Sequence, residues 1–317
     1  MSIWQLPEGI DELTGNRALA FESMRRQLLD LYGKKGFELV IPPLVENVES
    51  LLLTSASVDE KTFKFLDPAS GKMIGVHADI TPQIARIDAK TNRNKIAKYC
   101  YINAVLQTKA DDFYTSRSPI QAGAELYGCA DISADVEVIE LMIASLKLLN
   151  INPLVLSLGN VAVFAALVKN EQLDSDKTAT LRDIFSKRST PDLAVFLQNN
   201  ALKNADKFTA LMNLEGDSSV LDEALVLFKD LPGAQEAILD LTKIKQKLDS
   251  KEVKIVFDFA ELKTYEYHTG VVFSAYNENY SKALAQGGRY NGISASFGQS
   301  RAATGFSFDL KFLSQTE

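Results

Sequence analysis

Apolar residues near the start of the chain follow two different periods. Over residues 16–35 they recur every three or four positions, as at Leu28 and Leu31, which predicts an amphipathic helix that ends before Gly36. The run at 37–46 that follows is short, apolar and rich in β-branched residues, and it contains two prolines. This composition predicts a strand at the edge of a sheet or a strand that ends there.

Further strand-like runs lie on both sides of a long helical block. A helix is predicted from Asp131 or Ser133 to about residue 149, and helical spacing dominates from 161 to 249. The polar segment 108–118 predicts a long hairpin loop. The predicted strands are 73–78, 98–107, 119–127, 153–158, 253–259, 270–276 and 304–309. Strands before and after a helical block predict an α+β fold, with a core formed by 1–164 and 250–317 and a helical insertion at 165–249.

The composition of the chain argues against a nucleic-acid partner, a metal site and a membrane span. The formal net charge is −7 and the sequence pI is about 5.1, which argues against nucleic acid as a partner because phosphate binding needs a basic surface. The chain has two histidines and two cysteines, Cys100 and Cys129, without a Cys-x-x-Cys pair, so we expect no metal site and no cofactor. We interpret both cysteines as small buried residues in a reducing compartment. With neither a signal peptide nor a membrane-spanning run in the sequence, we expect a cytoplasmic protein.

Five segments in order resemble the catalytic core of class II histidyl-tRNA synthetases. The histidine signature of that family is similar to Lys263-Thr-Tyr-Glu-Tyr-His-Thr-Gly270, and its Arg-Pro-Glu-Gly-Thr segment is similar to His77-Ala-Asp-Ile-Thr-Pro-Gln-Ile-Ala-Arg86. The other segments are 32–46 for motif 1, 121–125 for the end of motif 2, and 287–292 followed by 305–313 for motif 3. The resemblance implies a mixed, mainly antiparallel sheet flanked by helices, and a homodimer built by motif 1.

The positions that activate the amino acid in that family hold other residues here. Formation of an aminoacyl adenylate places extra negative charge on a phosphate, and fixed cations stabilise that charge. By the resemblance, Gln107 stands at the motif 2 arginine, Lys263 at the arginine of the histidine signature and Phe312 at the motif 3 arginine. Asp309 replaces a motif 3 glycine close to the expected ATP position. We therefore predict that the chain does not catalyse aminoacylation.

The amino-acid pocket is partly kept. Asp79 and Thr81 match positions that hold the α-amino group of the substrate, and Gln121 and Glu125 match the pair that reaches its amine and imidazole. Carboxylate and amide oxygens are suitable acceptors for an ammonium and an imidazole N–H. By the same resemblance Tyr267 and His268 complete a candidate histidine-binding site: Asp79, Thr81, Gln121, Glu125, Tyr267 and His268.

Synthetase-like proteins of this form are regulatory subunits of the short-form ATP phosphoribosyltransferase, which catalyses the first step of histidine biosynthesis. The resemblance implies a chain that binds and activates the short catalytic subunit within a hetero-oligomer, and that transmits feedback by histidine. The family's anticodon-binding domain would follow motif 3, and since the sequence ends at Glu317 we expect no such domain.

Two other functions stay open at this point. One is a divergent ligase that activates histidine through Lys109 or Lys263, and the other is a stand-alone sensor of histidine or uncharged tRNA. Structural roles also compete with ligand binding. Asp79 and Glu125 are alternatively carboxylates satisfied by backbone amides, and His268 a packed histidine at a strand end. We favour a structural role for His77 and a tight turn at Gly287-Gly288.

Overall fold

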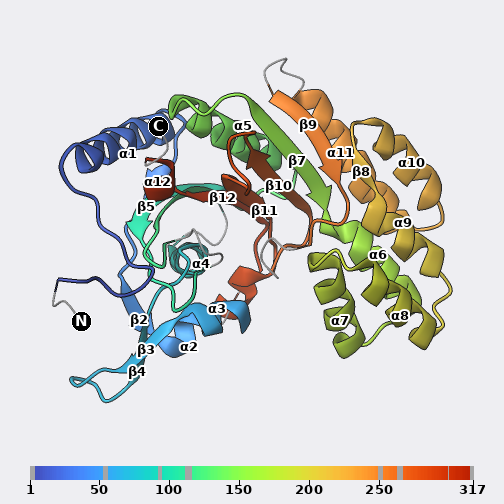
Figure 1. Ribbon diagram of the computed structural model, residues 1–317, viewed down its shortest axis with the longest axis horizontal. Helices are drawn as coiled ribbons and strands as arrows, with labels where there is room; N and C mark the ends of the chain where they lie inside the picture. Colours follow the sequence, from blue (N-terminus) through green and yellow to red (C-terminus); the bar gives the residue numbers. More distant parts are fainter. Residues whose placement is uncertain are drawn as a thin grey trace. The chain divides into compact units, whose positions relative to one another are not determined.

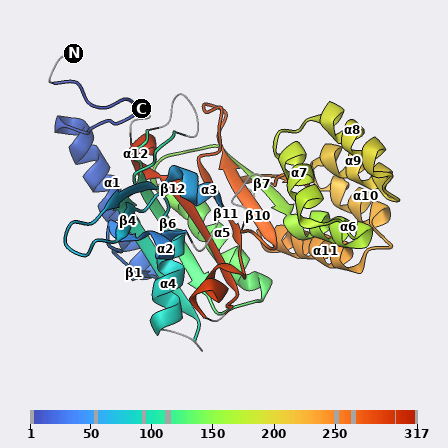
Figure 2. The same cartoon turned by 90° about the horizontal axis from the view of Figure 1, so that it is seen from below.

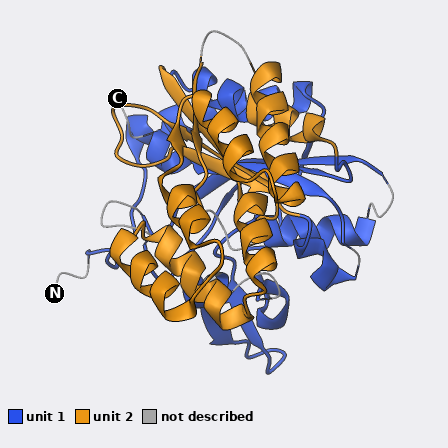
Figure 3. Ribbon diagram, turned by 90° about the vertical axis from the view of Figure 1, so that its right-hand side faces the viewer, with its two compact units in different colours: residues 1–130, 141–151, 291–317 blue, residues 131–140, 152–290 orange. Residues whose placement is uncertain are grey.

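The computed structural model describes residues 4–52, 56–91, 95–110, 116–248, 253–262, 267–298 and 300–314. These residues form two units, shown in blue and orange in Figure 3. Unit 1 contains residues 1–130, 141–151 and 291–317, and unit 2 contains 131–140 and 152–290. Helix α5 (Ile132–Leu148) contributes to both units. No helix in the described ranges has both the length and the apolar character needed to cross a bilayer.

The main strands of unit 1 follow the order β1-β5-β6-β12. Strands β5 (Ala97–Ala104), β6 (Ile120–Tyr127) and β12 (Ala303–Asp309) pair antiparallel, and β1 (Glu38–Leu39) pairs parallel with β5. A second sheet has the order β2-β4-β3, with bounds Val45–Asn47, Met73–Val76 and Phe63–Leu66. The helices of this unit are α1 (Gly15–Lys34), α2 (Val48–Leu51), α3 (Ala56–Lys61), α4 (Thr81–Thr91), the 3-10 turn η1 (Ile293–Phe297) and α12 (Leu310–Leu313).

Helices α1 and α4 cover opposite faces of the β5-β6-β12 strands. The Tyr32 ring on α1 meets the Phe306 ring edge-on at 6.4 Å, and both side chains are buried. Thr81 on α4 contacts Glu125, which pairs with Gly305 in the neighbouring strand. Because side chains alternate along a strand, the Gly305 position and Phe306 face opposite sides. The α4 side therefore carries the polar residues 121 and 125, and the α1 side is apolar.

The strands of unit 2 follow the order β11-β10-β7-β9-β8. Their bounds are β7 Leu154–Asn160, β8 Glu215–Gly216, β9 Val253–Asp258, β10 Val271–Tyr276 and β11 Ala285–Arg289. Figures 1 and 2 show the helices of this unit gathered in one group: α6 Val161–Glu171, α7 Ser175–Ser186, α8 Thr190–Asn200, α9 Ala205–Asn213, α10 Ser219–Leu227 and α11 Pro232–Lys247. Phe164 packs edge-on against Phe185 at 5.3 Å and Phe208 at 6.4 Å, so an aromatic core holds the helices together.

Most predicted elements are confirmed within a few residues, including the helix over 16–35 and all seven of the strands predicted outside 37–46. Helix α1 ends as expected, because Gly36 takes a φ of +81° and the Phe37 N–H bonds the Tyr32 carbonyl oxygen. The predicted helical block is also observed from α6 to the end of α11 at Lys247, although it contains the two-residue strand β8. The division of the chain into a core and an insertion at 165–249 remains a prediction.

Two local predictions are wrong in part or whole, and two elements were missed. The run at 37–46 lies at sheet edges as predicted, but it forms two short strands, β1 and β2, and not one. Pro42 and Pro43 lie between them and have no N–H to give to a sheet. Gly287-Gly288 lies inside strand β11 and not in a tight turn. Strand β3 and helix α4 were not predicted, although the buried residues Ile84, Ala85 and Asp88 of α4 do recur at helical spacing.

Candidate functional site

Three neighbouring strands of unit 1 place a three-by-three grid of residues on one face. Strand β6 lies in the middle, and its cross-strand partners on β5 and β12 are fixed by the antiparallel register. The three rows of the grid are Tyr99, Glu125 and Gly305; Tyr101, Gly123 and Ser307; and Asn103, Gln121 and Asp309. The segment that leads into α4, residues 79–81, lies against this face through hydrogen bonds to Gln121 and Glu125.

Glu125 is the buried carboxylate of the grid, with 1% of its surface exposed. Its Oε1 accepts hydrogen bonds from the Thr81 hydroxyl at 2.8 Å and from the Tyr101 hydroxyl at 3.1 Å. Its Oε2 lies over Gly305, where an added Cβ would come within 1.5 Å of that oxygen. Glycine at 305 is therefore a steric requirement of the Glu125 position. A carboxylate held by two hydroxyl donors is a strong acceptor for a ligand cation.

Gln121 connects the segment before α4 to strand β12. Its Oε1 accepts from the Ile80 N–H at 3.0 Å, which fixes the orientation of the amide. Its Nε2 donates to Asp79 Oδ1 at 2.8 Å and to the Ser307 hydroxyl oxygen at 3.0 Å. Both amide protons are used inside the protein, so Gln121 positions its neighbours and keeps only acceptor capacity for a ligand.

Asp79 is a second buried carboxylate, 7% exposed. Burial raises its pKa above the ordinary aspartate value, and hydrogen bonds from Gln121 and the Thr81 N–H oppose that shift. The ionised form is thus held in a place that disfavours it. A bound ammonium group would relieve this cost, so the site favours a cationic ligand.

We expect Asp79→Asn to make the protein more stable at neutral pH while it weakens cation binding. A raised folded-state pKa means that the folded protein binds the Asp79 proton more tightly, so stability falls as pH rises from the unfolded pKa through the folded one. Asparagine mimics the neutral acid and removes this loss, which we expect to raise the free energy of unfolding by about 1 kcal/mol at pH 7.5.

Urea denaturation at pH 4 and pH 7.5 measures this effect. The gain should be smaller at pH 4, because protonation of Asp79 has already removed part of the cost in the parent protein. Asp30→Asn, at an exposed carboxylate on α1, is the control. Equal or lower stability of Asp79→Asn at pH 7.5 would contradict the burial argument.

The remaining two predicted site residues, Tyr267 and His268, lie in unit 2. The His268 ring is 6% exposed and packs at 5.2 Å from the Tyr267 ring and 6.5 Å from the Tyr290 ring. Gly288 on β11 makes room for it, since a Cβ there would lie 2.7 Å from His268 Cδ2. The structure thus brings Asp79, Thr81, Gln121 and Glu125 together in unit 1. That Tyr267 and His268 act with them stays a prediction.

Of the positions compared with synthetase arginines, Gln107 and Phe312 have structural contacts, and so has Lys109, which was compared with the motif 2 glutamate. Gln107 Nε2 donates to the Ala78 carbonyl oxygen at 3.1 Å, directly before Asp79. Phe312 lies on α12, and its N–H bonds the Asp309 carboxylate at 3.2 Å. Lys109 pairs with exposed Glu60 at 2.9 Å. Lys263 lies outside the described residues.

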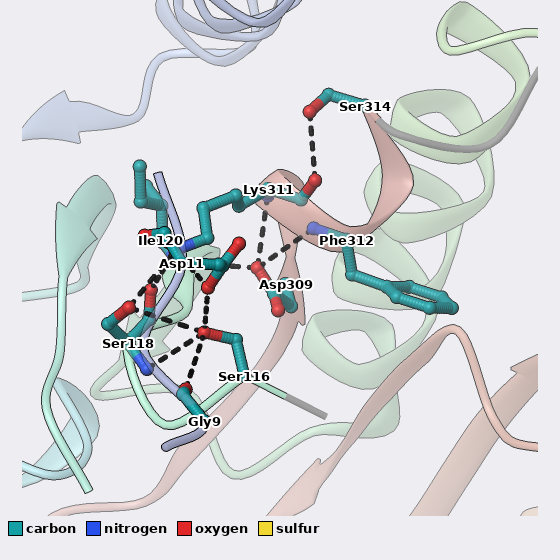
Figure 4. Close-up of polar contacts among 9 residues, drawn as sticks. All are labelled: Gly9, Asp11, Ser116, Ser118, Ile120, Asp309, Lys311, Phe312 and Ser314. Carbon is teal, nitrogen blue, oxygen red and sulfur yellow. Dashed lines mark hydrogen bonds and ion pairs between the residues drawn. The ribbon is translucent and has the colours of Figure 1, made fainter. Parts of the chain in front are cut away.

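Asp309 is the N-cap of α12 (Figure 4). One of its oxygens accepts from the backbone N–H groups of Ile120, Lys311 and Phe312 at 3.0–3.2 Å. The Lys311 ammonium, buried in unit 1, donates to the Ser118 carbonyl oxygen at 2.6 Å and pairs with Asp11 at 2.8 Å. These contacts fasten the N-terminal segment to α12. The aspartate at 309 therefore has a local role in capping the last helix.

The other polar candidates fit structural roles. His77 is fully buried, and its Nε2 lies 2.8 Å from the Ala104 carbonyl oxygen. Burial raises the pKa of the Cys100 thiol to about 12, which suits an inert core residue, while Cys129 is half-buried. Among the residues that the structure describes, no group of three or more His, Cys, Asp or Glu side chains is placed to hold a metal ion.

Comparison with known proteins identifies the family. The family model described as histidyl-tRNA synthetase matches residues 9–313. An ATP phosphoribosyltransferase regulatory subunit from Thiobacillus denitrificans is 44% identical over 99% of this chain and 98% of its own length. The chain belongs to the ATP phosphoribosyltransferase regulatory subunits, a histidyl-tRNA synthetase-like family. The regulatory subunit from Hahella chejuensis is 37% identical over 98% of this chain and 79% of its own length.

Solved structures agree with this regulatory-subunit fold. An ATP phosphoribosyltransferase regulatory subunit/histidyl-tRNA synthetase from Bacillus halodurans matches with a TM-score of 0.88 and 25% identity, over 99% of this chain and 84% of its own. A chain of the ATP phosphoribosyl transferase (HisG:HisZ) complex from Thermotoga maritima matches with a TM-score of 0.69 and 18% identity, over 92% of this chain and 97% of its own. The predicted mixed, mainly antiparallel class II fold is confirmed.

Sequence reasoning missed three grid residues that contact Gln121 or Glu125: Tyr101, Gly305 and Ser307. Tyr101 lies in a predicted strand, and Gly305 and Ser307 lie in the motif 3-like segment. Their contacts depend on which residues face each other across β5, β6 and β12. The period-2 alternation of β12 signalled only that 305, 307 and 309 share a face.

Proposed function

We propose that this regulatory subunit binds the short-form ATP phosphoribosyltransferase catalytic subunit and raises its activity, so that it acts in the first step of histidine biosynthesis. The observation that carries the proposal is the 44% identity with a regulatory subunit over nearly the whole length of both chains. The shared fold with a chain of the Thermotoga maritima complex supports a hetero-oligomer. Within it two copies of this chain pair as a homodimer, without nucleic acid, in the cytoplasm.

Binding to the catalytic subunit is tested by titration calorimetry with the two purified proteins and by gel filtration of the mixture. The proposal requires saturable binding and co-elution at a mass that contains at least two copies of this chain. Separate elution over the whole concentration range, with no heat of binding, would contradict it.

We further propose that histidine is the effector and that it binds at the grid cluster. By this name we mean Asp79, Thr81, Tyr101, Gln121, Glu125 and Ser307. Asp79 and Glu125 are buried acceptors far apart in sequence that Gln121 and Thr81 bring to a single face. One carboxylate can accept hydrogen bonds from the ammonium of an amino acid, and the other can accept from an imidazole N–H. Gln107, through Ala78, supports the segment that carries Asp79.

Feedback through this cluster needs a difference in histidine affinity between two states of the complex. Histidine changes the activity only as far as it binds one state more tightly, and the coupling is reciprocal between effector and partner. The cluster offers a physical means for such a difference. Residues 79–81 lead directly into α4, so a ligand that binds Asp79 also acts on the start of that helix.

A further inference from the structure

We infer that the Ser307 hydroxyl is a ligand contact, which donates a hydrogen bond to the carboxylate of the amino-acid effector. This inference rests on the proposed binding of histidine at the grid cluster. It adds a residue outside the set predicted from the sequence and gives the site a means of distinguishing an amino acid from an amine.

Ser307 stands in the middle row of the grid, on β12, opposite Gly123. Its oxygen accepts one hydrogen bond, from Gln121 Nε2 at 3.0 Å. A serine hydroxyl has one O–H donor as well as its lone pairs, so the proton of Ser307 points elsewhere. Among the described residues, the Gln121 contact is the one hydrogen bond that the structure assigns to this hydroxyl. Ser307 is half-buried, so the residue as a whole is partly shielded from bulk water.

The other side-chain donors of the cluster have acceptors inside it. The hydroxyls of Thr81 and Tyr101 both donate to Glu125 Oε1. The two protons of the Gln121 amide go to Asp79 and to Ser307 itself. The cluster thus presents two carboxylates for a cation and one hydroxyl donor for an anion or a carbonyl group. Ser307 is the member for whose O–H the described residues show no acceptor.

The spacing suits an α-amino acid. Asp79 Oδ1 lies 2.8 Å and Ser307 Oγ lies 3.0 Å from the same nitrogen, Gln121 Nε2. An acceptor for an ammonium and a donor for a carboxylate therefore flank one atom. The ammonium and carboxylate of an α-amino acid are attached to one carbon, so both groups reach these partners together. The Tyr101 hydroxyl occupies the space over Gly123, since a Cβ at Gly123 would lie 2.5 Å from the hydroxyl oxygen. This leaves no room for a ligand over Gly123.

The experiment combines removal of the hydroxyl with removal of the ligand carboxylate. The full-length chain and its Ser307→Ala variant are titrated calorimetrically with L-histidine, with histamine, which lacks the carboxylate, and with histidinol, which carries an alcohol in its place. A hydrogen bond to a charged group contributes enough for about a tenfold change in affinity. We expect Ser307→Ala to bind histidine about tenfold more weakly and to bind histamine as the parent protein does.

Ser23→Ala, at an exposed position on α1, is the control for the substitution itself, and thermal unfolding of each variant confirms that it is folded. Equal losses for histidine and histamine would overturn the inference, because Ser307 would then act only by holding Gln121. An unchanged histidine affinity would also overturn it, with water as the partner of the hydroxyl. A parent protein that binds none of the three ligands would remove the proposed effector site, and this inference with it.

Discussion

Replacing Gly305 by alanine should abolish histidine binding and lower the stability of unit 1. The new methyl group would stand 1.5 Å from Glu125 Oε2 and 2.8 Å from the Ala124 carbonyl oxygen. Glu125 would have to leave its place and lose the hydrogen bonds from Thr81 and Tyr101, with its carboxylate still buried. Overpacking together with a poorly satisfied carboxylate should cost about 3 kcal/mol of unfolding free energy, and we expect histidine affinity to fall at least about a hundredfold.

Urea denaturation and calorimetric titration with histidine measure both effects. Gly33→Ala is the matched control, since a Cβ at Gly33 on α1 meets nothing within 4 Å. Combining Gly305→Ala with Glu125→Ala removes the clashing side chain, so it should recover much of the stability while binding stays lost. A Gly305→Ala protein with parental stability and histidine affinity would show that the site is not built over this glycine.

Breaking the buried ion pair between Arg301 and Asp88 should be the most destabilising single change in unit 1. Arg301 Nη1 lies 2.7 Å from each Asp88 carboxylate oxygen, and the two side chains are 5% and 0% exposed. Arg301→Ala leaves the carboxylate buried without its cation, a situation that costs about 3–5 kcal/mol of unfolding free energy. Asp88 lies on α4, so the loss should also loosen the helix that begins at the candidate site.

The pH dependence of the stability lost in Arg301→Ala gives a second readout. Burial already raises the Asp88 pKa, against the opposing effect of Arg301, and removal of the arginine raises it further. The neutral acid carries no unpaired charge, so the loss from Arg301→Ala should be largest near pH 7.5 and shrink as pH falls. Urea denaturation at pH 7.5 and at an acidic pH measures this loss. Arg26→Ala, at an exposed ion pair on α1, is the control. A loss below about 1 kcal/mol at pH 7.5 would contradict the account.

The sequence predicted this fold well where the periods were clear. Helix α1 and strand β6 follow directly from apolar spacing, and the resemblance of 77–86 and 121–125 to synthetase motifs identified four residues that the structure brings together. These segments could be predicted because their motifs and periods depend on the local sequence and not on which residues lie beside them in the fold.

What the sequence could not predict depends on contacts between strands. Ser307 and Gly305 become site residues only through the register of β12 with β6, which turns and packing set. Gln107 likewise has a clear role, holding Ala78, only once the strands are placed. Asp309 was expected near an ATP position, and its role as the N-cap of α12 follows from a helix too short to show a period.

The most direct test of the central claim is the rate of a purified short-form ATP phosphoribosyltransferase catalytic subunit from the same source, measured with increasing amounts of this chain. The account predicts a large, saturable rise in rate that reaches its plateau at a fixed ratio of the two chains, and a lower plateau when histidine is added. An unchanged rate at every ratio would contradict it.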